Sequence, residues 1–160
     1  MSPREKKEPP RLDRWGRGGA ESVRGGVLDA AYRSWFRMGW AGLENIPAEG
    51  GALLVSNHAG MMPLDGGLIQ YGIQDELERQ VYLLAHHGFF QFPFVGRTLN
   101  RAGTVVAHPD NAHRLLREEG RLVAVFPEGE KGPVKPKSER YRLQRFGRGG
   151  FVETALRLLS

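Results

Sequence analysis

Residues 53–66 read LLVSNHAGMMPLDG, an apolar run that leads into a loop holding His58 and Asp65. A short, continuous apolar run is typical of a strand buried in a sheet that is covered on both faces. A second apolar run, residues 122–126, also leads into a polar turn, and Glu128 lies just past its end. Because ligands gather at the carboxyl ends of parallel strands, we expect these two loops to form the rim of an active site.

Hydrophobic periodicity along the chain predicts an α/β domain with a mostly parallel or mixed central sheet flanked by helices. The expected strands are residues 52–56, 81–85, 104–107 and 122–126. One expected helix begins at Val27, and four others cover residues 65–73, 89–100, 109–119 and 151–159. Pro93 interrupts the helix at 89–100 near its start, and Gly120 supplies a left-handed stop after 109–119.

An aromatic stripe runs through the first expected helix and just beyond it. Its members are Tyr32, Trp35, Phe36 and Trp40. Their spacing favours packing against the core of the domain. The alternative is a helix that lies in a membrane interface, because tryptophan flanked by arginine suits the headgroup boundary.

The composition is that of a globular domain, since 40% of the 160 residues are hydrophobic and 26% are charged. The absence of cysteine excludes disulfides, zinc–thiolate sites and a cysteine nucleophile. No apolar stretch approaches the roughly 20 residues that cross a bilayer, and no signal-peptide core follows the N-terminus. We therefore expect a soluble or peripheral protein.

Positive charge is concentrated in two segments of the chain, whose formal net charge is +5. Residues 1–20 hold six Lys or Arg against three Asp or Glu, and residues 135–148 hold six against one. Both segments suit an anionic partner such as lipid, a phosphorylated cofactor or nucleic acid. Residues 1–26 also lack apolar periodicity, so we expect a flexible basic arm there, followed by a folded domain at 27–160.

His58 and Asp65 have the residue types of an oriented general base. A neutral imidazole accepts a proton from an alcohol near neutral pH, and a carboxylate on its other nitrogen fixes the tautomer and stabilises the imidazolium. No serine stands in a G-x-S-x-G turn, so the attacking oxygen is expected to belong to a substrate. Glycines 60, 66 and 67 are expected to bring loop amides close to ligand oxygens.

The other histidines do not indicate a metal site. His86 and His87 are neighbours, and neighbours on a strand point to opposite faces of the sheet. His108 and His113 lack a carboxylate partner at the spacing of metalloproteases. We expect no metal, and we expect Asp110 to start its helix.

The polar loops also carry a resemblance to a known family. Asn57-His58 followed by Asp65, together with the later Phe126-Pro127-Glu128-Gly129, resembles the paired NH…D and FPEG motifs of the glycerolipid and lysophospholipid acyltransferase superfamily. The resemblance extends over residues 30–159. It implies transfer of a fatty acyl group from acyl-CoA or acyl carrier protein to the hydroxyl of a glycerolipid or lysophospholipid.

The same resemblance implies a role for each motif residue. His58 would deprotonate the acceptor hydroxyl, and Asp65 would orient the histidine. The expected substrate-binding residues are Asn57, Phe126, Pro127, Glu128, Gly129 and Lys131.

Three departures from the family's pattern refine these expectations. Six residues separate His58 from Asp65 where the family commonly has fewer, so the loop must bulge for the two side chains to meet. The arginine that commonly follows the third strand is replaced by Val-Ala-His-Pro at 106–109. We therefore expect an acceptor without a phosphate there, or one whose phosphate is bound by Lys131, Lys135 or Arg97. The chain also ends before a further strand that relatives carry, so the domain is expected to be truncated at its C-terminus.

The leading interpretation has an acyl thioester donor, a lipid acceptor, no resident cofactor and no nucleic acid. We expect a cytoplasmic protein that is peripheral to the inner face of the membrane. One alternative is a hydrolase that uses the same pair of residues to activate water. Another is a nucleic-acid-binding module, because Arg/Gly-rich segments occur at 14–19 and 145–150.

Overall fold

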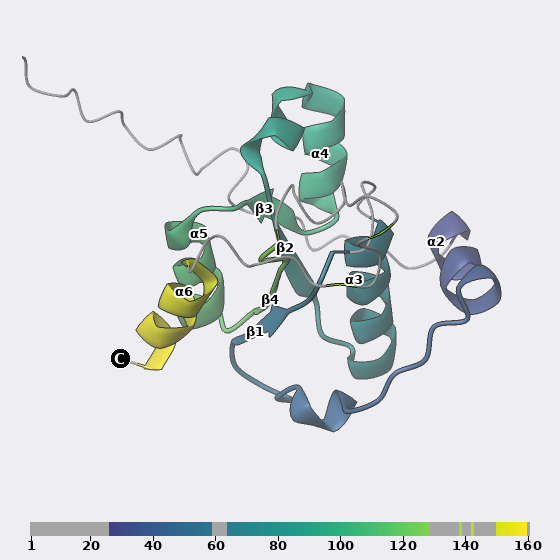
Figure 1. Ribbon diagram of the computed structural model, residues 1–160, viewed down its shortest axis with the longest axis horizontal. Helices are drawn as coiled ribbons and strands as arrows, with labels where there is room; N and C mark the ends of the chain where they lie inside the picture. Colours follow the sequence, from purple (N-terminus) through teal and green to yellow (C-terminus); the bar gives the residue numbers. More distant parts are fainter. Residues whose placement is uncertain (1–25, 59–63, 129–137, 139–141, 143–149, 160) are drawn as a thin grey trace, which may run out of the picture.

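Four strands form the centre of the computed structural model, which describes residues 26–58, 64–128, 138, 142 and 150–159. The strands are β1 (Ala52–Val55), β2 (Val81–Ala85), β3 (Thr104–Val106) and β4 (Leu122–Val125). Each of the three pairings is parallel, and the order across the sheet is β1-β4-β2-β3 (Figure 1). The α/β class expected from the sequence is therefore confirmed.

Burial along the strands follows their place in the sheet. Leu122 and Val123 of the central strand β4 are completely buried, because β1 and β2 flank it. β1 lies at an edge, and its residues are half-buried apart from Val55, which is exposed. The expectation that this strand is buried is wrong, since an apolar run alone does not distinguish an edge strand from a central one.

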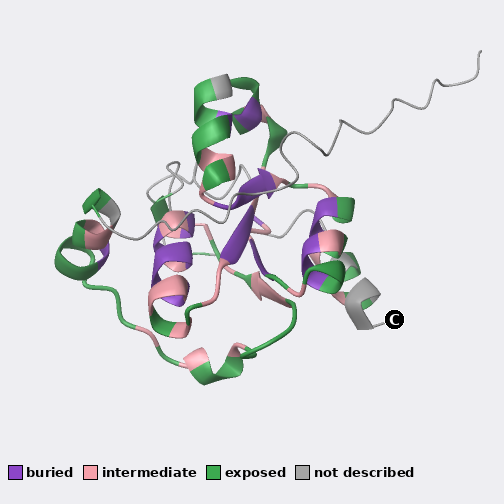
Figure 2. Cartoon of the chain, turned by 180° about the vertical axis from the view of Figure 1, so that it is seen from behind, coloured by how far each residue is buried: buried purple, intermediate pink, exposed green. Residues whose placement is uncertain are grey.

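Helices cover both faces of the sheet (Figures 1 and 2). One face is covered by α3 (Leu64–Leu77). The other face is covered by α5 (Pro109–His113) and the π-helix η4 (Arg114–Glu118), and α6 (Gly150–Leu159) lies beside α5. Alternate strand residues face opposite sides of a sheet. Leu83 and Ala124 therefore pack with Ile73 of α3, whereas Val123 packs with Leu115 of η4.

Helix boundaries differ from the expected ones at two places. α3 continues to Leu77 instead of ending at 73, because Leu77 still packs on the apolar cluster between α3 and the sheet. The expected helix at 89–100 is two helices, the 3-10 helix η3 (His87–Gln91) and α4 (Pro93–Arg101). Phe92 separates them in an extended conformation, which is the one favoured before proline. The helical segment that begins at Pro109 stops, as expected, at Gly120, whose φ is +60°.

The N-terminal helix divides the aromatic stripe between core and surface. The helix α2 (Gly26–Ala30) passes directly into the π-helical turn η1 (Ala31–Trp35). Tyr32 is buried, and its hydroxyl accepts a hydrogen bond from Trp40 Nε1 at 2.5 Å. Trp35 is 81% exposed and Phe36 is also exposed, so the expected core packing of these two is wrong. A π turn holds more residues than an α turn, and residues spaced for an α-helix no longer share one face.

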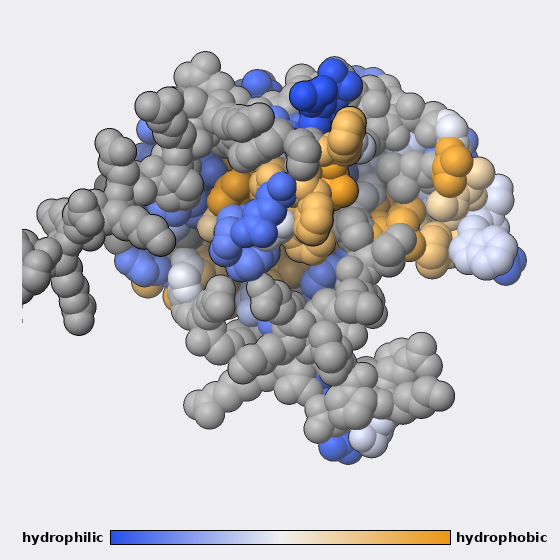
Figure 3. Space-filling view, turned by 90° about the horizontal axis from the view of Figure 1, so that it is seen from above, coloured by the Kyte–Doolittle hydropathy of each residue, from blue (hydrophilic) through white to orange (hydrophobic). Residues whose placement is uncertain are grey.

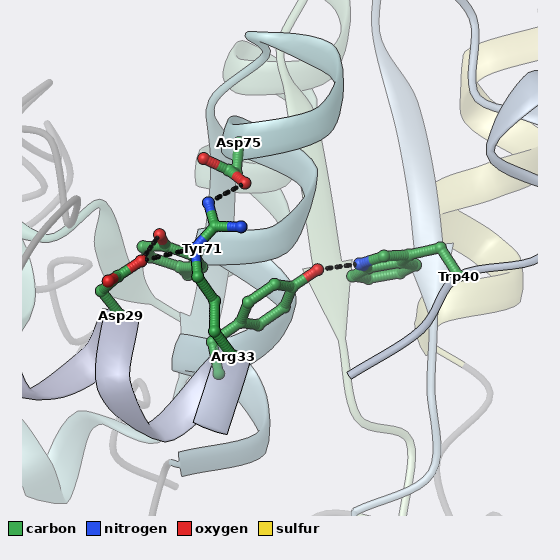
Figure 4. A network of polar contacts seen from close by, with 6 residues as sticks. Asp29, Arg33, Trp40, Tyr71 and Asp75 are labelled. Carbon is green, nitrogen blue, oxygen red and sulfur yellow. Dashed lines mark hydrogen bonds and ion pairs between the residues drawn. The ribbon is translucent and has the colours of Figure 1, made fainter. Parts of the chain in front are cut away.

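Polar contacts attach this N-terminal segment to α3 (Figure 4). Arg33 Nε lies 2.8 Å from Asp29 Oδ1, and Arg33 Nη2 lies 2.7 Å from Asp75 Oδ2. The Tyr71 hydroxyl donates a hydrogen bond to Asp29, which lowers the pKa of the Asp29 carboxyl and raises the pKa of the Tyr71 hydroxyl. Exposed ion pairs contribute little one at a time, but together these contacts hold η1 against the helix whose first turn carries Asp65.

Within the described residues, no helix is both long enough and apolar enough to cross a bilayer. The expected basic arm, residues 1–26, lies outside the described residues except for Gly26. The Arg/Gly-rich segment at 14–19 is also outside them, and so is the segment at 145–150 except for Gly150.

Candidate active site

The candidate site is assembled from three segments at one edge of the sheet. β1 ends at Val55 and leads to His58, while β4 ends at Val125 and leads to Glu128. Val55 and Val125 are paired in neighbouring parallel strands, so the two loops leave the sheet at the same level. Asp65 enters from the first turn of α3, which starts at this edge (Figure 1).

His58 and Asp65 are in contact despite the six residues between them. His58 Nδ1 lies 2.6 Å from Asp65 Oδ2, and the expectation that the two side chains meet is confirmed. Asp65 Oδ1 accepts a hydrogen bond from the Gly66 amide at 2.8 Å, which fixes the carboxylate. A carboxylate on Nδ1 keeps the neutral imidazole protonated there and leaves Nε2 as the acceptor. The side chains are 20% and 22% exposed, so the pair is shielded from bulk water but accessible to a ligand.

Gly66 explains how Asp65 reaches the sheet edge. A Cβ atom at this position would lie 2.8 Å from Leu83 Cδ1 and 3.6 Å from Phe126 Cε2. The absence of a side chain therefore allows the first turn of α3 to press directly on the sheet. The sequence expectation that this glycine offers its amide to a ligand is wrong, because Gly66 is buried and its amide is bonded to Asp65.

The ring of Phe126 packs beside the imidazole of His58. The ring centroids of Phe126 and His58 are 4.8 Å apart, and the planes are inclined at 31°. Phe126 also packs on the cluster that contains Leu83 and Ala124, so its position is fixed by the core. The ring thus limits the orientations open to His58, in addition to the restraint from Asp65.

The other expected substrate-binding residues differ in exposure. Glu128 is only 6% exposed, Pro127 is half-buried and Asn57 is exposed next to His58. A carboxyl group withdrawn from water in this way depends on hydrogen bonds or nearby charge for its stability. Gly129 and Lys131 lie outside the described residues.

Two further histidines stand along the same edge, and the sequence did not predict their role. His86 follows β2 and accepts a hydrogen bond on Nδ1 from the Gly88 amide at 3.2 Å, and His108 follows β3 and accepts one on Nδ1 from the Asp110 amide at 3.3 Å. Each side chain caps the helix that starts there. His108 Nδ1 also lies 3.4 Å from Asp110 Oδ2, so this ring is held by the first turn of its own helix. Imidazole is not among the usual capping groups, so no strong sequence signal marks this arrangement.

The expected geometry of His86 and His87 requires correction. The two residues lie past the end of β2, and their ring centroids are 4.2 Å apart, so the side chains do not point to opposite faces. The part of the chain that the structure describes contains no group of three His, Cys, Asp or Glu side chains arranged to hold a metal ion. Asp110 lies in the first turn of its helix, as expected, but the side chain that caps the helix is that of His108.

Comparisons with known proteins point to one family. A family model described as "Acyltransferase" matches residues 37–158. An uncharacterized protein of Mycobacterium leprae (strain TN) is 50% identical over 127 residues, which are 78% of this chain and 34% of that protein. Uncharacterized proteins of Mycobacterium bovis and Mycobacterium tuberculosis (strain H37Rv) are each 50% identical over 133 residues, which are 82% of this chain and 37% of theirs. This chain thus spans about a third of the length of these relatives. No solved structure matches.

Proposed function

The chain belongs to the acyltransferase family, and we propose that it transfers a fatty acyl group to a substrate hydroxyl with His58 as the general base. The observation that carries this proposal is the 2.6 Å contact between His58 Nδ1 and Asp65 Oδ2. It gives the imidazole a fixed tautomer with a free basic nitrogen at the edge of a parallel sheet. The acyl thioester is a co-substrate in this proposal, and no resident cofactor takes part.

The proposed reaction begins with a hydrogen bond from the acceptor hydroxyl to His58 Nε2. As the proton moves to Nε2, the hydroxyl oxygen forms a bond to the carbonyl carbon of the thioester. The carbon–sulfur bond then breaks, and the thiolate leaves with the proton carried by the imidazolium. The products are an ester and a free thiol, and His58 returns to its neutral form.

Asp65 acts through His58 in this mechanism. Its carboxylate accepts a hydrogen bond from the Nδ1–H group and offsets the positive charge that develops on the ring. The Gly66 amide holds the second carboxylate oxygen, so Asp65 needs no rearrangement when the charge appears. Phe126, at 4.8 Å between ring centroids, restricts the imidazole on one side and excludes water there.

The proposed substrates are an acyl-CoA or acyl carrier protein as donor and a glycerolipid or lysophospholipid as acceptor. Asn57, Phe126, Pro127 and Glu128 are the described residues that we assign to substrate binding, and Gly129 and Lys131 complete the proposed set. An acceptor without a phosphate at the end of β3 is supported by His108. Its Nδ1 accepts a hydrogen bond from the Asp110 amide and lies 3.4 Å from Asp110 Oδ2, so the ring contacts its own helix and provides no bidentate guanidinium for a phosphate.

We further propose that the reaction takes place where the protein meets a membrane on its cytoplasmic side. The acceptor and the acyl chain of the donor are both lipids, which partition into bilayers. A protein that binds the bilayer surface reaches them without extracting either one into water.

Product identification tests this function. The purified protein is supplied with radiolabelled acyl-CoA and a panel of lysophospholipids, monoacylglycerol, diacylglycerol and lysophosphatidate. We expect label in an acylated lipid, release of free thiol that depends on the acceptor, and loss of both in His58→Ala. Preference for lysophosphatidate that survives replacement of Arg97, Lys131 and Lys135 would contradict the proposed acceptor class but leave the acyl transfer intact.

A hydrolase is the second candidate, because the same oriented imidazole activates water as readily as an alcohol. The two functions differ only in the group that attacks the thioester. Label that appears in free fatty acid at an equal rate with and without acceptor lipid assigns the hydrolase and refutes the transferase.

A further inference from the structure

Aromatic side chains project into solvent from the hairpin formed by η3 and α4. Phe92 is 67% exposed and Phe94 is 83% exposed, and Phe89 and Val95 are exposed as well. Phe90 of the same segment is buried, so the hairpin has its own inward anchor. The outward residues therefore form a separate apolar tip, which consists of Phe89, Phe92, Phe94 and Val95.

The tip stands on the same edge of the sheet as His58. η3 begins immediately beyond the carboxyl end of β2, and α4 returns the chain toward β3. Figure 1 shows this hairpin rising above the sheet on the side where α3 begins. Figure 3 looks down on this side and shows apolar side chains gathered at the centre of the face, with strongly hydrophilic groups beside them. The apolar tip and the candidate base thus face the same direction.

Hydrogen bonds within α4 and a close approach between α4 and η3 define the backbone that carries these side chains. The Gly96 amide donates to Phe92 O at 2.8 Å, and Thr98 Oγ1 donates to Phe94 O at 3.0 Å. A Cβ at Gly96 would lie 3.1 Å from Phe90 Cα, so the two helices approach closely at this glycine. Pro93 stands in the first turn of α4, where its restricted φ suits a helix.

The charged residues in the hairpin's own sequence are all basic. Between Glu78 and Asp110 the sequence contains no acidic residue, whereas α4 carries Arg97 and Arg101, both exposed. Aromatic rings flanked by arginine suit the boundary between headgroups and acyl chains, and the cations favour anionic lipid. A second copy of this chain is a poorer partner, because a symmetric contact would bring the arginines of both copies together.

We propose that the η3–α4 hairpin docks the protein on an anionic bilayer, with the apolar tip inserted and Arg97 and Arg101 at the headgroups. This orientation turns the edge that carries His58 toward the lipid. The docking proposal identifies the membrane as a partner in the proposed function, and the biological role of docking rests on that function. The binding itself requires no acyl transfer, so the two proposals are tested separately.

Vesicle flotation tests the docking. Vesicles of phosphatidylcholine with phosphatidylglycerol are compared with vesicles of phosphatidylcholine alone. We expect the protein to prefer the anionic vesicles, and we expect Phe92→Ser with Phe94→Ser to weaken that binding by about tenfold or more, since each buried ring contributes strongly. Arg97→Gln with Arg101→Gln should remove the preference for anionic vesicles.

Leu156→Ser is the matched control, because Leu156 is 61% exposed on α6, away from this edge. It should bind vesicles as the wild type does. The proposal is overturned if the double phenylalanine variant binds vesicles with wild-type affinity. It is also overturned if that variant only converts an oligomer to a monomer, which would assign the tip to a second copy. Loss of vesicle binding with unchanged turnover of a water-soluble short-chain acceptor separates docking from catalysis.

Discussion

Replacing Gly66 by alanine tests whether close packing of α3 on the sheet positions Asp65. The new Cβ would lie 2.8 Å from Leu83 Cδ1, well inside ordinary contact at 3.4 Å or more, so the first turn of α3 or Leu83 must give way by several tenths of an ångström. Leu83 is buried in the cluster with Ile73 and Ala124 and has little space to retreat. Overpacking of this kind costs about 1–3 kcal/mol, and alanine regains up to about 1 kcal/mol of helix propensity.

We therefore expect Gly66→Ala to lower the free energy of unfolding by about 1–2 kcal/mol and acyl transfer by about tenfold to a hundredfold. The larger effect on turnover follows because any retreat of α3 lengthens the contact between His58 and Asp65, now 2.6 Å. Urea denaturation gives the first quantity, and acceptor-dependent thiol release under saturating substrate gives the second.

Gly72→Ala is the matched control in the same helix. A Cβ at Gly72 would lie 2.5 Å from Trp40 Cζ2, so this variant is also overpacked, but far along α3 from Asp65. We expect it to lose stability and keep turnover. Equal losses of turnover in the two variants, or no loss in Gly66→Ala, would show that Gly66 does not position Asp65 against His58.

Three further predictions concern contacts around the site. Asp29→Asn removes a carboxyl group whose pKa is lowered from 3.8 by the hydrogen bond from Tyr71, so the stability that this carboxylate contributes is present above pH 3.8 and is lost as the pH falls below that value. The difference in unfolding free energy between wild type and variant should therefore shrink as the pH is lowered, and a constant difference would contradict this prediction. Trp40→Phe deletes the donor to the Tyr32 hydroxyl and should cost about 1 kcal/mol by urea denaturation with turnover unchanged, so a loss of turnover would count against a purely structural role. Phe126→Ala opens the space beside the candidate base and should cost about 2–4 kcal/mol in unfolding and lower turnover, whereas full turnover would show that the ring is not needed there.

Much of the fold was predictable because its signals are local. The strands at 81–85 and 122–125 are short apolar runs between turn residues, and Gly120 marks a helix end because it can adopt a positive φ. The order β1-β4-β2-β3 had no such signal, since it depends on which hydrophobic faces meet after the chain collapses. For the same reason the edge position of β1 could not be read from its sequence.

Two departures from α-helical geometry account for the main errors. The π turn at 31–35 rotates Trp35 out of the line set by Tyr32, and nothing in the apolar spacing marks such a turn. The extended Phe92 splits the expected helix in two, and Phe92 and Phe94 are exposed while Phe90 is buried. Sequence patterns assume a regular period, and a single irregular turn is enough to move a side chain from core to surface.

The candidate site was predicted through its chemistry more than through its geometry. A histidine and a carboxylate close in sequence have the residue types of a general base, and the resemblance of the paired motifs to an acyltransferase pattern singled out His58 and Asp65. The supporting residues did not, because their roles depend on packing. Gly66 matters for the space that it leaves free, and His86 caps a helix from a position just past the expected strand at 81–85.

The most direct test of the account compares three enzymes in acceptor-dependent thiol release from an acyl thioester. They are the wild type, His58→Ala and Asp65→Asn, with folding of each verified by circular dichroism. We expect both substitutions to lower the rate by about a hundredfold or more, because a base that is absent and a base that is wrongly oriented both fail to take the proton. A rate for Asp65→Asn close to that of the wild type would contradict the assignment of the pair as a functional unit.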